Sequence, residues 1–221
     1  MKTDTNRKRA GLGAALMVAG GLLVLSALSL FLYNDFDDRR ASEVASRVAD
    51  ALISEIEARA AETPSAAPDA DYVTDTGGEN GTLSRETTIS MDGETYIGVL
   101  RVPALGLALP VTRDWSYEKL KKSPCRYSGS IEEDNIVIAA HNYKRHFGNI
   151  QTLSPGDVLT FTDAGGAEYV YAVAEIETLE ATAVGEMTDG AYSLTLFTCT
   201  YGGAARIAVR CGKRASPVVF D

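Results

Sequence analysis

The hydrophobic and polar positions of this 221-residue chain follow three successive patterns. The first is a run over residues 10–33 that has no charged side chain and is rich in Leu, Ala, Val and Gly. As a helix rising about 1.5 Å per residue, this run is long enough to span the hydrocarbon core of a bilayer. We therefore predict a cytoplasmic N-terminus and a transmembrane signal anchor over residues 1–34.

The charges on either side of the apolar run predict its orientation. Basic residues precede it and acidic residues come first after it, namely Lys2, Arg7, Lys8 and Arg9 before and Asp35, Asp37 and Asp38 after. An excess of positive charge holds a terminus in the cytoplasm. We expect a single-pass protein of the cell membrane with its C-terminal part extracellular. A cleaved signal peptide is the alternative, but its apolar core is usually only about 7–15 residues long.

The second pattern predicts a helical stalk over residues 35–62. This segment lacks Gly and Pro, and its apolar residues recur at spacings of three and four: Ala41, Val44, Ala45, Val48, Leu52 and Ile56. A solvated spacer and a dimerising coiled coil both fit, and we take the spacer because the run is shorter than three to four heptads. Residues 63–88 then become rich in Pro, Gly, Asp and Ser, which predicts a flexible linker.

The third pattern, over residues 89–221, consists of short β-rich runs between turn residues. The predicted strands are 96–102, 107–111, 135–140, 158–161, 168–176, 192–199 and 206–211. One short helix is expected near residues 116–122. The fold class is therefore all-β, as a closed barrel or a sandwich, and we prefer the barrel because closure removes exposed strand edges.

Composition and charge exclude several classes of protein. The chain has 21 Lys+Arg against 30 Asp+Glu, a net charge of −9, so no nucleic-acid partner is expected. With 45% hydrophobic residues and 3 cysteines it is neither disordered nor a disulfide scaffold. It also lacks a CxxC pair, an HExxH sequence, a Gly-x-Ser-x-Gly elbow and a Gly-rich phosphate loop. A cysteine–histidine arrangement is the chemistry that remains.

Three residues fit that chemistry. Cys199 ends a predicted strand, His141 directly follows another, and Arg206 begins the strand after the turn that follows Cys199. A neighbouring cation stabilises the thiolate that attacks a carbonyl, a histidine can protonate a leaving amine, and a guanidinium can bind an oxyanion. From the residues alone, a buried and inert Cys199 is equally possible. Arg210 competes with Arg206 because both share one face, and we choose Arg206, which lies nearer the turn.

Other residues carry weaker signals. His146 is expected on a surface loop, since Lys144 and Arg145 mark a solvated turn. Trp115 and Tyr117 are expected to anchor a helix on the barrel rather than to bind a ligand. Cys125 and Cys211 could form a disulfide or remain two unrelated thiols.

The sequence around these residues resembles the sortase family of cysteine transpeptidases. The run from Thr195 to Cys199, Thr-Leu-Phe-Thr-Cys, is similar to the family's Thr-Leu-x-Thr-Cys signature. Residues 136–142 resemble the sortase histidine strand, and residues 97–103 and 109–111 resemble its opening strands. The resemblance covers about residues 96–211. Asn142 and the Thr-Tyr pair after the cysteine resemble class B, but the segment before the cysteine strand is too short for that class's long helix, so the subclass stays open.

The resemblance implies a closed eight-stranded sortase-like β-barrel with Cys199, His141 and Arg206 as the catalytic triad. Thr198, Asn142 and Tyr143 would contribute to substrate binding. No cofactor and no metal are expected, because a solvated turn explains Glu132, Glu133 and Asp134 better than the calcium-binding acidic loop of some class A sortases.

The implied reaction is a two-step acyl transfer. A thioester on Cys199 would form with a sorting motif of the Leu-Pro-x-Thr-Gly kind in a secreted protein. An amine of a cell-wall precursor or a pilin would then resolve it. Two alternatives remain: a membrane-tethered cysteine peptidase that only hydrolyses peptides, and a non-catalytic surface module that binds a partner.

Overall fold

The computed structural model describes residues 3–62 and 86–214. Contacts divide the chain into two units, Met1–Arg40 and Ala41–Asp221, and helix α1 (Thr3–Glu62) contributes residues to both. In the first unit, Leu16–Tyr33 has a mean hydropathy of 2.2 and no buried residue, so it has the length and composition of a membrane span. Most of the predicted linker, residues 63–85, lies outside the described residues.

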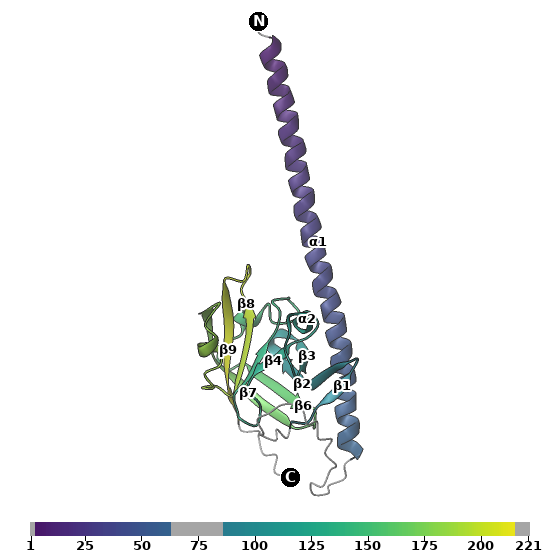
Figure 1. The fold of residues 1–221 in the computed structure, drawn as a ribbon, viewed down its shortest axis with the longest axis vertical. Coiled ribbons are helices and arrows are strands. Elements are labelled where there is room, and N and C mark those ends of the chain that lie inside the picture. The colour runs from purple at the N-terminus through teal and green to yellow at the C-terminus, as the bar shows by residue number, and fades with distance from the viewer. Residues whose placement is uncertain (1–2, 63–85, 215–221) are drawn as a thin grey trace. The chain divides into compact units, whose positions relative to one another are not determined.

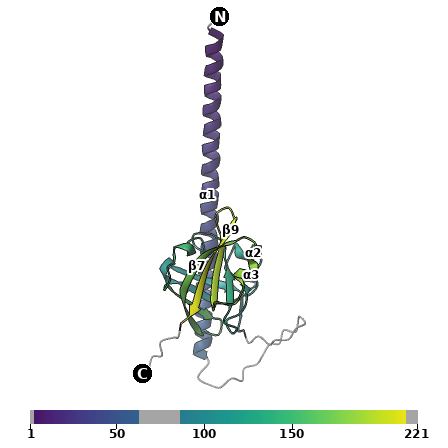
Figure 2. The same ribbon diagram turned by 90° about the vertical axis from the view of Figure 1, so that its left-hand side faces the viewer.

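The second unit is built on one sheet of nine strands (Figure 1). The strands are β1 (Ile89–Met91), β2 (Glu94–Val102), β3 (Leu107–Thr112), β4 (Cys125–Ser128), β5 (Ile136–Ala139), β6 (Val158–Asp163), β7 (Glu168–Glu180), β8 (Leu194–Cys199) and β9 (Ala205–Lys213). They follow the order β1-β2-β3-β4-β5-β8-β9-β7-β6, and β2 also pairs with β6. That pairing closes β2 to β9 into an eight-stranded barrel, so the all-β prediction is confirmed, and β7 and β9 lie side by side in Figure 2.

Short helices interrupt the connections between strands. They are α2 (Tyr117–Leu120), α3 (Val184–Met187) and the 3-10 turns η1 (Pro103–Leu105) and η2 (Ile150–Thr152). The predicted helix near 116–122 corresponds to α2, which begins because the Ser116 hydroxyl accepts a hydrogen bond from the Lys119 amide.

Barrel closure depends on a close approach at Gly98. This residue of β2 has φ +155 and lies opposite Asp163 of β6. An added Cβ would lie 2.2 Å from the carbonyl oxygen of Thr162, which is closer than any real contact. Glycine at this position therefore lets β2 pair with β6, which closes the ring of strands.

The strand side chains alternate between the barrel interior and its outer surface. In β8, Leu194 and Leu196 belong to the interior core, whereas Phe197 packs in a smaller cluster on the outer face. In β9, Val209 is interior and Ala208 is in that outer cluster. This period of two also puts Cys199, Arg206 and Arg210 on the outer face.

The part of α1 that belongs to the second unit covers the barrel rather than acting as a solvated spacer. Val48, Leu52 and Ile56 form one buried cluster with side chains of β1 and β2, and Leu52 has no exposed surface. This packing explains why β2 is buried on both faces, since its outward residues Tyr96 and Val99 contact the helix. The apolar stripe seen in the sequence thus has a partner within the same chain.

Candidate active site

The carboxyl ends of β5 and β8 bring His141 and Cys199 to the same edge of the sheet. The two strands run parallel, with Ala139 opposite Phe197. The register continues past β5, because the Ala140 amide donates to the Phe197 carbonyl at 3.2 Å. Two residues beyond the Ala139–Phe197 pair, the chain reaches His141 on one side and Cys199 on the other, so both lie at one end of the barrel.

Thr198 fastens the two strand ends together. Its hydroxyl donates a 2.8 Å hydrogen bond to the carbonyl of Ala140, and its side chain is buried. This bond crosses from β8 to β5 one residue before the predicted nucleophile and one residue before His141. Thr198 therefore fixes the separation of the two strands at the place where the chemistry is expected.

Arg206 lies directly opposite Cys199 on the neighbouring antiparallel strand. The β8–β9 register pairs Cys199 with Arg206, and side chains of opposed residues start about 4.5–5.5 Å apart on one face. The intervening turn is closed by hydrogen bonds between Thr200 and Ala205. Two carbonyls of the turn region, those of Gly203 and Ala205, accept from Arg206 Nη1 at 3.1 and 3.0 Å.

Arg210, the competing arginine, lies farther along β9 and is engaged elsewhere. It pairs with Thr195 rather than with Cys199, and it is only 2% exposed. Its guanidinium donates to the Glu177 carboxylate at 2.6 Å. Of the two arginines, Arg206 is thus the one paired across the strands with Cys199, whose thiol is exposed.

The three cysteines differ sharply in accessibility. Cys199 is exposed, whereas Cys125 and Cys211 are buried free thiols, so the structure contains no disulfide between them. Burial raises the pKa of the Cys125 thiol and raises that of Cys211 to about 12. Because the thiolate is the nucleophile, the two buried residues are poorly suited to catalysis and Cys199 is the candidate.

A compact turn carries His141. The Tyr143 ring stacks on the imidazole with ring centroids 4.7 Å apart and planes 14° from parallel. The Tyr143 carbonyl accepts from the amides of His146 and Gly148, and the His141 carbonyl accepts from the Phe147 amide. The backbone thus folds back on itself immediately after the histidine, which limits how the ring can move.

His146 lies in this turn, and the expectation of a surface position was wrong. Its side chain has no exposed surface, because the reverse turn directs His146 and Phe147 inward while Lys144 and Arg145 remain exposed. In the described part of the chain neither ring nitrogen has a hydrogen-bond partner. Burial, followed by the charge of His141, lowers the pKa of His146 to about 4, so this ring is neutral at pH 7.

An apolar cavity of about 250 Å³ opens beside Cys199 and Arg206. Three groups of side chains form it: the sheet itself, the segment around α2, and the segment around α3. Its described lining is Trp115, Tyr117, Leu120, Tyr127, Ala139, Ala140, Ala181, Ala183, Val184, Met187, Phe197, Thr198, Cys199 and Arg206. Arg206 carries the only charge among these residues, so the cavity suits an apolar group attached to a polar backbone.

Aromatic rings form one wall of the cavity. The Tyr127 ring contacts Phe197 edge to face at 5.1 Å and Trp115 at 5.4 Å, and Trp115 contacts Tyr117 at 5.6 Å. Trp115 and Tyr117 are 42% and 75% exposed, and both line the cavity. The sequence offered no strong signal for this position.

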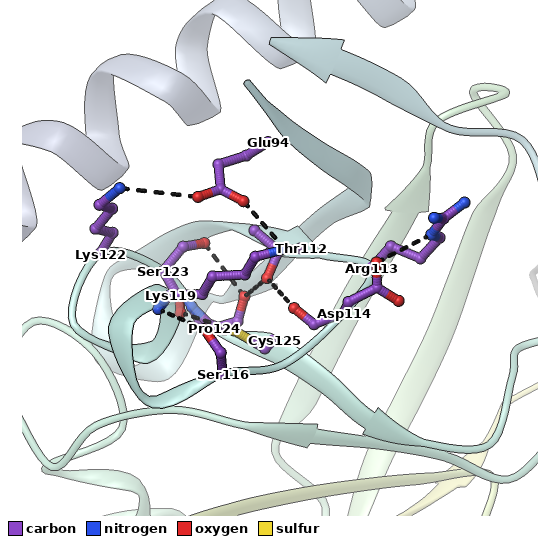
Figure 3. A network of polar contacts seen from close by, with 10 residues as sticks. All are labelled: Glu94, Thr112, Arg113, Asp114, Ser116, Lys119, Lys122, Ser123, Pro124 and Cys125. Atoms are coloured by element: carbon purple, nitrogen blue, oxygen red, sulfur yellow. Dashed lines mark hydrogen bonds and ion pairs between the residues drawn. The ribbon is translucent and has the colours of Figure 1, made fainter. Parts of the chain in front are cut away.

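A polar network holds the α2 wall in place (Figure 3). Glu94 of β2 pairs with Lys119 at 3.2 Å and with Lys122 at 3.8 Å, one on each side of the end of α2. The hydroxyl of Thr112, at the end of β3, lies within hydrogen-bond distance of the Asp114 and Pro124 carbonyls. Both ends of the segment that carries the aromatic residues are thereby tied to the barrel.

The remaining predicted residues lie near the site or apart from it. Asn142 and Tyr143 belong to the His141 turn and do not line the described cavity. Asp134, at the end of the predicted acidic turn, accepts a hydrogen bond from Ser193 at 2.8 Å. Among the side chains that the structure describes, there is no group of three or more His, Cys, Asp or Glu that could hold a metal ion.

Comparison with known proteins identifies the fold. No curated protein matches the chain. Similar solved structures include sortase A from Corynebacterium diphtheriae, at 19% identity and a TM-score of 0.50 over 57% of this chain and 64% of that one. Sortase C1 from Streptococcus suis is 23% identical, with a TM-score of 0.49 over 56% of this chain and 75% of that one. The sortase D5 transpeptidase of Clostridium perfringens is 21% identical, with a TM-score of 0.48 over 54% and 79%.

The family comparison extends over the residues that build the site. The model of the sortase domain matches residues 100–214, which include His141, Cys199 and Arg206 and make up more than half of the chain. The chain belongs to the sortase family.

Proposed function

We propose that this protein is a membrane-anchored transpeptidase that cleaves a C-terminal sorting motif of secreted proteins through a thioester on Cys199. Membership of the sortase family supports a cysteine transpeptidase of the sortase type. The observation that carries the assignment of residues is the exposed Cys199 opposite Arg206, at the mouth of an apolar cavity.

The first step is acylation of the enzyme. The Cys199 thiolate attacks the carbonyl carbon of the scissile peptide bond, and donors of Arg206 bind the oxyanion that develops. As the C–N bond breaks, the proton of the imidazolium of His141 passes to the leaving nitrogen. A thioester and a released C-terminal peptide result.

The second step transfers the acyl group. An amine of a cell-wall precursor or a pilin attacks the thioester carbonyl, His141 accepts the proton of that amine, and the Cys199 thiolate leaves. The enzyme thereby returns to its first state, with Cys199 as the thiolate and His141 protonated. If water replaced the amine, the same residues would give a peptidase.

The secondary residues support these roles. Thr198 keeps the β5 and β8 ends together through its bond to Ala140, and the Tyr143 ring orients the imidazole of His141 by stacking. Asn142, next to the histidine and half-buried, would contact the peptide backbone. The apolar cavity would take an aliphatic side chain of the sorting motif.

Mass spectrometry of the full chain in detergent micelles tests the reaction. The protein is incubated with a panel of Leu-Pro-x-Thr-Gly peptides, with and without an added amine. We expect an acyl adduct on Cys199 and an amide product that depends on the amine. Cys199→Ala should abolish the adduct, whereas Cys125→Ala, which removes a buried thiol, should retain it. Peptide hydrolysis that no amine can divert would favour a peptidase. Absence of any adduct, with Cys199 resistant to alkylation, would favour a binding module.

The role of Arg206 has a matched control. Arg206→Lys keeps the charge but loses the planar fork of donors, and we expect the acylation rate to fall by about 10²–10³-fold, as for loss of an oxyanion donor. Arg113→Lys alters an exposed arginine paired with Asp114 and should leave the rate unchanged. Equal effects of the two changes would contradict the proposed role.

The membrane topology is a separate part of the proposal. The apolar helix segment Leu16–Tyr33 supports an anchor, and the basic residues before it support a cytoplasmic N-terminus. The test combines Thr5→Cys with Cys199→Ala, so that the exposed native thiol does not contribute. This double variant should react with a membrane-impermeant maleimide only after the cells are permeabilised. Labelling at position 5 in intact cells, or a mature protein that lacks this position, would refute the topology.

A further inference from the structure

We infer that Arg210 is a positioning residue that holds the α3 wall of the cavity against the sheet and thereby controls binding of the peptide rather than the reactivity of Cys199. The consequence for peptide binding rests on the function proposed above. The structural part, that Arg210 fixes α3, stands on the contacts of the described residues alone.

Arg210 has an unusual environment for a charged side chain. It is 2% exposed, and each of its three guanidinium nitrogens donates a hydrogen bond. Nε donates to the Glu177 carboxylate of β7 at 2.6 Å, and Nη1 donates to the Thr195 hydroxyl of β8 at 3.2 Å. The Tyr192 ring lies 5.6 Å from the guanidinium carbon. A buried charge persists only when it is satisfied in this way.

Two of the bonds reach out of the sheet to α3. Nη2 donates to the Glu186 carbonyl at 2.6 Å, and Nη1 donates to the Met187 carbonyl at 3.1 Å. These carbonyls belong to the last turn of α3, where no further helical amide follows to bind them. A single planar side chain thus connects α3 to both β7 and β8, a geometry for which the guanidinium fork is suited.

The clamped segment is a wall of the cavity. Ala183, Val184 and Met187 line it, and Met187 packs in the outer-face cluster with Ala208. Along the outer face, the opposed pairs are Cys199–Arg206, Phe197–Ala208 and Thr195–Arg210, in that order. Arg210 therefore acts at the far end of the cavity from the thiol, which separates its effect from the chemistry.

Two variants of the full chain test the inference. Arg210→Met removes the donors, and Arg210→Lys keeps a charge beside Glu177 but lacks the fork that reaches both α3 carbonyls. With the Leu-Pro-x-Thr-Gly peptide that the wild-type protein uses best, we expect KM to rise about 10- to 100-fold in both variants, with a smaller change in kcat. Alkylation of Cys199 by iodoacetamide should stay within about twofold of the wild-type rate.

Glu168→Gln is the matched control. It removes an exposed carboxylate at the start of the same strand, β7, and leaves every bond of Arg210 in place, so KM should stay near the wild-type value. A wild-type KM in the Arg210→Lys protein, or an equal fall in peptide turnover and in alkylation, would overturn the inference.

Hydrogen exchange separates this inference from the proposed function. The Met187 and Thr188 amides donate to the Ala183 and Val184 carbonyls and report directly on α3. They should exchange faster in the folded Arg210→Lys protein than in Glu168→Gln, whether or not any peptide reacts. If they do not, Arg210 does not hold α3. If none of the peptides forms an acyl adduct with the wild-type protein, the proposed function is refuted instead.

Discussion

At the scale of single residues, His146 gives the barrel a dependence on pH. The folded protein holds the ring neutral with a pKa of about 4, whereas an unfolded chain has the ordinary value near 6.5. Between these values the unfolded state binds more protons, so stability is present above pH 6.5 and is lost as the pH falls. From pH 7 to pH 5 the free energy of unfolding should drop by about 2 kcal/mol from this group.

His146→Leu tests this dependence. The change removes two ring nitrogens that have no partner among the described residues, so we expect stability at pH 7 to be equal or higher. Urea unfolding at pH 7, 6 and 5 should give a flatter profile than the wild type. His141→Gln, which alters the other histidine of the chain, is the control and should keep most of the slope. An unchanged slope in His146→Leu would mean that other groups cause it.

Gly148 is a second residue whose replacement should be costly. A Cβ there would lie 2.5 Å from the Asn142 carbonyl oxygen and 2.7 Å from that of Tyr143. Because both contacts are backbone, Gly148→Ala must displace the turn that carries His141. A misplacement near 1 Å can reduce a rate by about 100-fold. We expect such a loss in kcat/KM, measured with the best peptide of the panel.

Gly212 offers the comparison for that substitution. An added methyl group at Gly212 meets open space, so Gly212→Ala should keep the wild-type kcat/KM. Thermal unfolding of both variants would separate a local effect on the turn from a general loss of stability. If Gly148→Ala were fully active, the position of the turn would not determine the position of His141.

At the scale of elements, the ion pairs of Glu94 should stabilise the α2 wall. Glu94→Gln removes the attraction to Lys119 and Lys122, which is worth about 0.5–1 kcal/mol for partly exposed pairs, or roughly two- to fivefold in KM. Glu118→Gln breaks a neighbouring pair with Lys121, but Glu118 is 82% exposed, so this control should change nothing measurable. Peptide kinetics and thermal unfolding decide, and equal values for both variants would mean that Glu94 does not position α2.

The elements also indicate which parts of the fold a sequence reveals. A short β-rich run predicted β5, and alternation predicted the face of β8 that carries Cys199; together they predicted that His141 and Cys199 lie at strand ends. The same reasoning missed β4, whose four residues are too few and too polar to show alternation. It missed β1 as well, although Asp92-Gly93 after that strand is a strong hairpin signal, with both residues at positive φ.

The candidate site also has parts that the sequence predicts and parts that it does not. Cys199, His141 and Arg206 lie in local motifs at strand ends, and the pattern of residues can predict where strands end. The anchoring of α3 depends on Arg210, whose bond to Glu177 joins residues 33 apart in sequence. Such a contact follows from the pairing of β7 with β9, and no local pattern encodes it. The buried position of His146 likewise depends on a reverse turn, whereas the charged neighbours Lys144 and Arg145 suggest a surface position.

At the scale of the whole molecule, the contacts of α1 set where the folded unit begins. The periodicity of residues 35–62 predicted an apolar face, and Val48, Leu52 and Ile56 of that face are buried on the barrel. A chain that starts at residue 41 lacks the apolar span and retains this packing, so it should be soluble and unfold near the temperature of the full chain. A chain that starts at residue 86 exposes Ile89, Tyr96 and Val99 to water and should be less stable.

The buried side chains of α1 set the size of the stability loss expected when the chain starts at residue 86. Val48, Leu52 and Ile56 are each buried to 91% or more, and burial of one such side chain contributes about 1.5–3 kcal/mol. Loss of even one of these contributions should lower Tm by roughly 3–10 °C for a domain of this size. Calorimetry of the two truncated chains measures the effect. Leu52→Asp in the longer chain should reproduce it, whereas Glu57→Gln, on the exposed side of the same helix, should not. Equal Tm values for the chains starting at 41 and 86 would mean that the helix does not stabilise the barrel and acts as a solvated spacer. The stability of the site would then depend on the barrel alone.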